Sequence, residues 1–216
     1  EHRLQLRRPP LPTPAIRQQG AALRSRAAAS LLSPALRAGG VLCGETAAWV
    51  HLGVAAPSRI SVITRGLFRR PAGIHGAWQI HQVPVRRSEM RMMGGVRVTD
   101  AQRTAVDLFL GIGCRGPKRP LDELHRLASA PSRRLQDWPA RASSATSQYQ
   151  ATPLVAGAAD VRLLRQREAV LERLMASGAL SVDHLLEEIL ARLPAGGAQQ
   201  RRRKAHIREV LAGCTR

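Results

Sequence analysis

Residues 41–53 read Val-Leu-Cys-Gly-Glu-Thr-Ala-Ala-Trp-Val-His-Leu-Gly. Residues 94–108 read Gly-Gly-Val-Arg-Val-Thr-Asp-Ala-Gln-Arg-Thr-Ala-Val-Asp-Leu. These two stretches decide the fold. Each combines small and apolar residues with neighbouring glycines, which predicts a short buried helix. In the first stretch Glu45 suits the positive end of a helix over residues 44–52, and Gly53 is placed to end it. Trp49 is the largest core residue that we expect there.

The residues between these two stretches predict a small sheet. Apolar β-branched residues indicate strands at 59–64, 78–85 and 96–98, and the glycine pair at 94–95 predicts a turn before the third strand. We therefore expect an α+β fold, in which a small β-sheet with flanking short helices is followed by a helical C-terminal region.

A helix is predicted from about residue 100 to residue 110. Thr99 and Gln102 have the spacing of a capping box at its start. Arg103 and Asp107 lie four residues apart on this helix, so they either pair with each other or leave Arg103 to anchor the neighbouring sheet. We expect no catalytic role for them, because no second carboxylate or nucleophile stands at a fixed spacing beside them.

The rest of the chain divides by composition. Four prolines in residues 1–20 predict a disordered basic segment. A helix is predicted over 21–36, with Leu23, Ala27, Leu31 and Leu32 on one side. Residues 114–159 lack sustained periodicity, which predicts a disordered insertion in which a short helix is possible at 121–127. Three C-terminal helices are expected at 160–177, 181–193 and 199–211. The predicted domains are 1–20, 21–113, 114–159 and 160–216.

The chain carries a net charge of +19, from 32 arginines and two lysines against 15 carboxylates. Such a field attracts polyanions such as nucleic acid. The alternative is codon bias, since GC-rich coding sequence is rich in Arg, Ala, Gly and Pro. The charge is concentrated in 1–40, 59–97, 115–141 and 201–216, whereas residues 160–192 sum to −1.

Two groups of basic residues are candidate nucleic-acid contacts. The densest run lies at the start of the last predicted helix, and the second group flanks the predicted strands. The alternative for both is solvated surface charge. The candidates are Arg201, Arg202, Arg203, Lys204, Arg69, Arg70, Arg86 and Arg87.

Other residue types indicate no catalytic or metal chemistry. Cys43, Cys114 and Cys214 are too far apart for a zinc site or a disulfide framework, which favours a reducing cytoplasm. His51, His75 and His81 lack the spacing of a metal site, and Trp49 and Trp78 fit a core better than a base-stacking platform. We therefore expect no enzyme activity and no cofactor. We also expect no membrane contact, since no apolar run approaches the length of a membrane span.

Several blocks together resemble a known family. They are residues 23–29, the block 40–53 with Glu45, Thr46 and Trp49, the block 95–108 with Arg103, Thr104 and Asp107, and residues 176–213. These blocks are similar to AbiEi-type antitoxins of type IV abortive-infection toxin–antitoxin systems, particularly those of actinobacteria. The resemblance covers residues 21–110 and 160–213.

The resemblance implies a non-enzymatic function. Such antitoxins use an N-terminal winged helix-turn-helix to bind their own promoter DNA, and they counteract a nucleotidyltransferase-like toxin without forming a stable complex with it. This sequence departs from them in three places: no full winged helix is recognisable in 1–20, residues 115–159 are unlike the family, and no nuclease-like domain follows residue 216. The alternatives are a protein-interaction module and a truncated or degraded relative without specific DNA binding.

Overall fold

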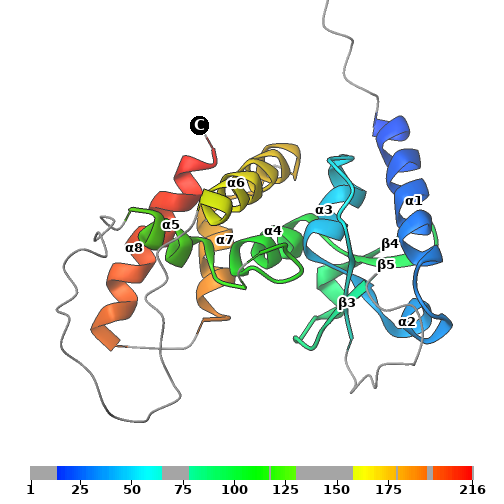
Figure 1. Cartoon of the computed structure of the whole chain (residues 1–216), viewed down its shortest axis with the longest axis horizontal. Coiled ribbons are helices and arrows are strands. Elements are labelled where there is room, and N and C mark those ends of the chain that lie inside the picture. Colours follow the sequence, from blue (N-terminus) through cyan, green and yellow to red (C-terminus); the bar gives the residue numbers. More distant parts are fainter. Residues whose placement is uncertain are drawn as a thin grey trace, which may run out of the picture. The chain divides into compact units, whose positions relative to one another are not determined.

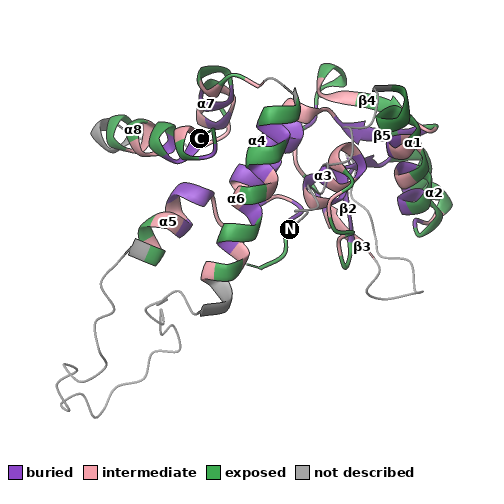
Figure 2. Ribbon diagram, turned by 90° about the horizontal axis from the view of Figure 1, so that it is seen from above, coloured by how far each residue is buried: buried purple, intermediate pink, exposed green. Residues whose placement is uncertain are grey.

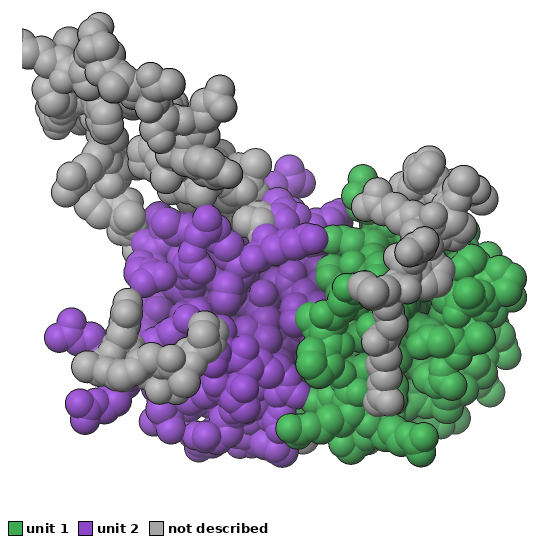
Figure 3. Space-filling model, turned by 90° about the horizontal axis from the view of Figure 1, so that it is seen from below, with its two compact units in different colours: residues 1–104 green, residues 105–216 purple. Residues whose placement is uncertain are grey.

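The computed structural model describes residues 14–64, 78–116, 118–129, 158–178, 180–193 and 197–215. The chain forms two compact units, residues 1–104 and 105–216, which Figure 3 distinguishes by colour. Among the described residues, a five-stranded mixed sheet occurs together with eight α-helices, so the predicted α+β class is confirmed (Figure 1). No described helix has the length and apolar character needed to span a membrane.

The sheet belongs to unit 1 and has the strand order β3-β2-β1-β5-β4. Its strands are β1 (Val41–Leu42), β2 (Ile60–Ile63), β3 (Trp78–His81), β4 (Met90–Met93) and β5 (Val96–Thr99). Strand β1 pairs antiparallel with β2 and parallel with β5, while β2 pairs parallel with β3 and β4 pairs antiparallel with β5. The sequence predicted β2, β3 and β5 but missed β1 and β4, and β3 ends at His81 rather than near residue 85.

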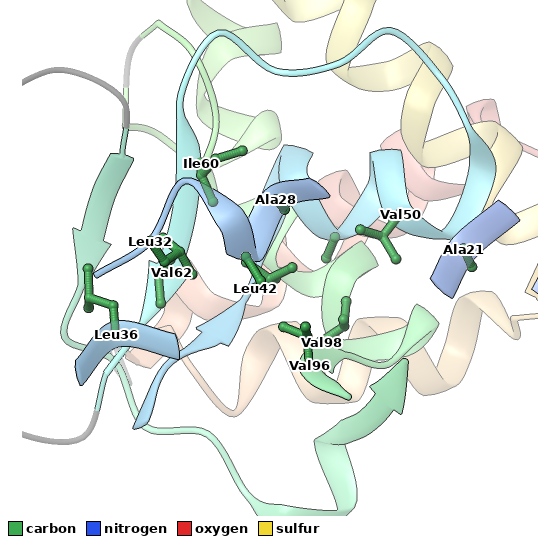
Figure 4. Packing of buried hydrophobic residues seen from close by; sticks show 12 residues of the cluster. Ala21, Ala28, Leu32, Leu36, Leu42, Val50, Ile60, Val62, Val96 and Val98 are labelled. Atoms are coloured by element: carbon green, nitrogen blue, oxygen red, sulfur yellow. The ribbon is translucent and has the colours of Figure 1, made fainter. Parts of the chain in front are cut away.

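The core of unit 1 lies between the sheet and the helices α1 (Pro14–Ser30), α2 (Pro34–Gly39) and α3 (Gly44–Leu52). Neighbouring residues of a strand point to opposite faces. Leu42 and Val62 therefore join this core, whereas Val41 and Ile63 join a second cluster on the other side of the strands. The main cluster, most of which Figure 4 labels, consists of Ala21, Ala28, Ala29, Leu32, Leu36, Leu42, Ala47, Val50, Ile60, Val62, Val96 and Val98.

Helix α1 differs from the prediction in two respects. It begins at Pro14, inside the segment 1–20 that we expected to be disordered, because proline is tolerated in the first turn of a helix. Its buried face is also not the one expected: Leu23, Ala27 and Leu31 are exposed. The residues that pack inward are small, which allows the helix to approach the sheet closely. They are Ala21, Ser25, Ala28 and Ala29.

Polar contacts fasten α1 to its neighbours. The Arg24 guanidinium donates to the Val50 carbonyl near the end of α3 from Nε, at 3.0 Å, and from Nη2, at 2.7 Å. Burial lowers the pKa of Arg24. The Ser25 hydroxyl donates to the Met93 carbonyl at 2.6 Å, which joins α1 to the end of β4. Helix α3 itself ends at Gly53, whose φ of +68° is readily adopted by glycine.

Helix α4 (Ala101–Leu110) begins at a different cap from the predicted one. The carboxylate of Asp100 accepts the backbone N–H of Arg103 at 2.7 Å, so Asp100 takes the capping position that we assigned to Thr99. The Thr99 hydroxyl instead pairs with the Thr104 hydroxyl at 2.8 Å. The boundary between the two units falls within α4, earlier than the predicted domain boundary at residue 113.

Unit 2 is built mainly from α5 (Leu121–Ser129), α6 (Ala158–Gly178), α7 (Val182–Leu190) and α8 (Gly197–Gly213). The last three match the predicted C-terminal helices closely. Alternation of buried and exposed residues along α6 is visible in Figure 2. Helix α5 lies where a short helix was considered possible at 121–127, and its buried Leu121 and Leu124 show that this part of the predicted insertion 114–159 is ordered. Residues 130–157 of that expected insertion lie outside the described part of the chain.

The turn between β4 and β5 leads to a first prediction. Gly94 and Gly95 both have positive φ, +57° and +81°, but a Cβ at Gly94 would lie 2.5 Å from the Ala22 carbonyl oxygen, whereas a Cβ at Gly95 would meet no atom within 4 Å. Gly95→Ala should therefore lower the free energy of unfolding by about 1 kcal/mol through backbone strain alone. Gly94→Ala should lower it by about 3 kcal/mol, because strain and collision add. Urea unfolding followed by the fluorescence of Trp49 and Trp78 measures both values, and equal losses would contradict the close packing of Gly94 on α1.

Candidate nucleic-acid interface

Unit 1 has a large surplus of positive charge. Its described residues include ten arginines and no lysine, against three carboxylates. The Glu89 carboxylate accepts the Arg86 backbone N–H at 2.6 Å and the Arg103 guanidinium at 3.0 Å, while Asp100 caps α4. Glu45 lies in the first turn of α3, where the helix dipole favours a negative charge. These acidic groups therefore have structural positions, and most of the arginines face solvent.

Three exposed arginines follow one another along the segment that enters the edge of the sheet. Arg86 and Arg87 lie at the 3-10 helix η1 (Arg87–Glu89), and Arg91 lies in β4. The side chains of Arg87 and Arg91 form no hydrogen bond or ion pair with any other described residue. We call Arg86, Arg87 and Arg91 the hairpin cluster. Planar guanidinium groups of this kind bind phosphate through two parallel hydrogen bonds.

Two other arginines of unit 1 serve the fold. Arg103 is buried, and its Nη1 contacts both the Glu89 carboxylate at 3.0 Å and the Pro84 carbonyl at 2.9 Å. These contacts attach α4 to the segment that leads into β4. The sequence had left two roles open for Arg103, pairing with Asp107 or anchoring the sheet, and the contacts correspond to the second. Arg97 donates to the Ala38 carbonyl in α2. The formal charge of the unit therefore overstates the charge that is available to a ligand.

His51 contributes no positive charge near the hairpin cluster at neutral pH. Its Nε2 donates to the Thr99 carbonyl at 2.7 Å. Burial lowers the pKa of His51, and the positive charges of Arg91 and Arg24 lower it further, against the opposing effects of the Thr99 hydrogen bond and Asp100. The positive field of this region thus comes from arginine alone.

The basic run of the last helix divides into two pairs. Arg203 Nε contacts the buried Asp122 carboxylate at 2.9 Å, and Lys204 Nζ contacts Glu187 at 3.0 Å. Arg201 and Arg202 are exposed and form no ion pair with a described residue. Half of the run that we predicted to contact nucleic acid is therefore engaged in holding α8 to α5 and α7.

Asp122 and Glu187, the partners of Arg203 and Lys204, are distant from them in sequence, so no residue spacing could have predicted these ion pairs. Further ion pairs of unit 2 are Arg208–Asp183, Arg119–Glu123, Arg192–Glu188 and His125–Glu168. The pairs Arg119–Glu123 and Arg192–Glu188 have the i,i+4 spacing of neighbours on a helix and were open to prediction. The other candidates, Arg69 and Arg70, lie outside the described residues.

The residues that carry the family resemblance are part of the scaffold. The Thr46 hydroxyl accepts the Ser61 backbone N–H at 2.9 Å, which ties α3 to β2. The Thr104 hydroxyl donates to the Asp100 carbonyl at 2.6 Å within α4. Trp49 packs against the main core of unit 1 and remains half-buried, and Asp107 is fully buried. Trp78, like Trp49, packs against this core.

Cysteines and histidines form no evident reactive centre among the described residues. All three cysteines are buried thiols. Burial raises the pKa of Cys214 to about 11, with further effects of Glu168 and Glu172, so this thiol stays protonated near neutral pH. Cys43 packs with Val41, Ile63 and Val85. Within the described ranges, no group of three His, Cys, Asp or Glu residues is arranged to hold a metal ion, and His75 lies outside those ranges.

Comparison with known proteins returned no matching family model, no matching curated protein and no matching solved structure.

The ion pairs of α8 predict unequal effects for two neighbouring arginines. Arg203→Ser should lower the free energy of unfolding of unit 2 by about 1–3 kcal/mol, because it leaves the buried Asp122 carboxylate without its guanidinium. Arg201→Ser removes the same charge from an exposed position and should change stability by less than about 0.5 kcal/mol. Helical circular dichroism during urea unfolding measures both. Equal effects would mean that the Arg203–Asp122 pair does not support the helices.

The His125–Glu168 pair predicts a pH dependence for unit 2. Hydrogen bonding to Glu168 raises the pKa of His125, with burial acting in the opposite direction. The protonated pair therefore stabilises the folded state fully below the ordinary histidine pKa of about 6.5, and this contribution is lost as pH rises through the raised value. His125→Gln should reduce stability at about pH 5.5 and have a smaller effect at about pH 8.5. Unfolding midpoints at the two pH values provide the measurement, and a pH-independent difference would rule out the ion pair as its cause.

Proposed function

We propose that this chain is a non-enzymatic regulator of the AbiEi-like antitoxin type, which binds its own promoter DNA through the hairpin cluster of unit 1. The observation that carries the proposal is the unequal use of charge in the two units. Solvent-facing arginines of unit 1 have few carboxylates nearby, whereas many cations of unit 2 are held in ion pairs. A larger share of the former is therefore available to neutralise phosphates and release counterions.

The chemistry of the cluster suits a DNA backbone. Arg87 and Arg91 are exposed and lack partners among the described residues, so a phosphate would not have to displace an existing carboxylate. Arginine stays charged over the whole physiological pH range, and it holds phosphate oxygens with a defined geometry. Phosphate contacts position a protein on DNA without reading its sequence. Promoter preference would then require further contacts to base edges or a dependence on DNA shape.

The antitoxin part of the proposal rests on the resemblance of blocks 40–53 and 95–108. On that basis the chain would counteract a nucleotidyltransferase-like toxin without forming a stable complex with it, in the cytoplasm. The motif residues Thr46, Arg103 and Thr104 have scaffold roles, which is compatible with a resemblance carried by structural rather than catalytic motifs.

A second candidate function, protein interaction, is favoured by exposed apolar side chains in unit 1. Ile16, Leu23 and Leu31 lie in or just after α1, and Met92 lies in β4. Large apolar side chains that stay exposed along one helix, as in α1, are typical of protein contacts.

Fluorescence anisotropy with two DNA fragments of equal length tests the DNA-binding function. The gene's own promoter should bind more tightly than its shuffled sequence, and affinity for both should fall as salt rises from about 50 mM to about 200 mM. The double variant Arg87→Ser/Arg91→Ser should weaken binding and reduce the salt slope by about 2. Arg201→Ser/Arg202→Ser has the same net charge and is the matched control, which should retain most of the affinity.

Each result has a distinct meaning. Equal affinity for promoter and shuffled DNA would remove the sequence-specific regulator from consideration. Equal losses in the two double variants would show that net charge, rather than the hairpin cluster, governs binding. An affinity insensitive to salt would argue against phosphate contacts altogether.

A further inference from the structure

Helix α1 has two apolar faces, of which only one is used by the core of unit 1. Successive residues of a helix are rotated by about 100°, so Ile16, Leu23 and Ala27 lie within about 40° of one another. The buried residues Ala21, Ser25 and Ala29 lie about 120° or more from all three. The exposed face continues at Leu31, which lies just after the last residue of α1 and whose backbone N–H still bonds to the Ala28 carbonyl at 3.2 Å.

We call Ile16, Leu23, Ala27 and Leu31 the outer stripe. The exposed fraction is 58% for Ile16, 61% for Leu23 and 55% for Leu31. Among the described residues, only one other large hydrophobic side chain, Met92, is comparably exposed, at 65%. Isolated apolar residues on a surface are ordinary, but three of the four most exposed ones along a single helical line form a patch that favours contact with another molecule.

The borders of the outer stripe are positively charged. Arg17 lies on one side of the stripe and Arg26 on the other, and both are exposed. Helix α1 contains no aspartate or glutamate. An apolar line with arginines along both borders is complementary to a helix that has apolar residues on one face and carboxylates along its borders.

We propose that the outer stripe is a docking surface for an acidic amphipathic helix of a partner protein. Ile16 and Leu23 are separated by seven residues, or two helical turns, which is the repeat with which one helix packs along another. The small side chain of Ala27 leaves room for a larger residue of the partner between Leu23 and Leu31. Glutamates at the borders of the partner helix would reach Arg17 and Arg26.

Two other occupants fit the outer stripe less well, one because of charge and one because of the shape of the apolar surface. A second copy of α1 would bring arginines against arginines, because the helix carries no carboxylate to face them. A membrane surface binds helices that present a broad apolar face, often with large aromatic residues. The outer stripe is narrow and contains no aromatic residue, and the opposite side of α1 is buried in the core.

A synthetic peptide of three heptads, with Leu at positions a and d and Glu at positions e and g, is the probe. It should bind the whole chain, and Leu23→Ser should weaken this binding about tenfold or more, because one buried Leu is lost. Met92→Ser removes an equally exposed apolar side chain outside α1 and should leave the affinity unchanged. A second peptide, with Lys in place of Glu, should bind at least tenfold more weakly than the first. Since Leu23 is exposed, unfolding of all variants should stay cooperative, with at most a small shift of the midpoint in Leu23→Ser from the lower helix propensity of Ser.

Several outcomes would overturn the proposal. Equal binding of the Glu and Lys peptides would do so, as would equal losses of affinity for Leu23→Ser and Met92→Ser. If the chain bound anionic lipid vesicles but not the Glu peptide, and Leu23→Ser abolished the vesicle binding, the stripe would be a membrane contact instead. Self-association in sedimentation that disappears in Leu23→Ser would assign the stripe to a second copy. Leu23→Ser leaves every arginine in place, so DNA binding should persist in it, and the two proposals can fail separately.

Discussion

A strand of two residues holds the sheet of unit 1 together. Val41 and Leu42 form β1, which pairs with β2 on one side and with β5 on the other, so among the described strands the two halves of the sheet meet only through it. Both side chains are buried, on opposite faces, and the pairing continues as the Cys43 N–H bonds to the Ser61 carbonyl at 3.0 Å. The Thr46 hydroxyl then accepts the Ser61 N–H, so α3 reinforces the same junction. The arrangement explains why residues 41–53 govern the fold.

The formal charge of +19 divides into cations with different roles. Arg24 and Arg103 bind backbone carbonyls within unit 1, and Arg203 compensates a buried carboxylate in unit 2. Guanidinium groups suit these positions because one group can satisfy several acceptors. A high arginine content therefore supports the fold as well as any polyanion binding, and codon bias and function are compatible explanations of it. Only the arginines without protein partners bear on the proposed ligand.

Much of the helical structure was predictable, because α6 and α7 carry apolar residues at helical spacing and Gly53 marks the end of α3. The glycine pair at 94–95 likewise marked its turn. The buried face of α1 was not predictable from leucines, since close packing on the sheet selects Ala and Ser instead. Strands β1 and β4 were missed because one is very short and the other reads Met-Arg-Met-Met. In the candidate interface the sequence identified Arg86 and Arg87 as exposed basic residues. It did not identify Arg91, because strand β4 was missed, nor the ion pairs of Arg203 and Lys204, because their partners lie far away in sequence.

The position of Arg91 has a consequence for solubility. Strand β4 lies at the edge of the sheet, and the unpaired N–H and C=O groups of an edge strand are a template for another chain. A charged side chain in such a strand disfavours edge-to-edge addition, since a second copy would place like charges side by side. The exposed Met92 beside it would otherwise promote such contacts. A cation at this position therefore disfavours edge-to-edge association of folded chains, in addition to the phosphate contact proposed for it.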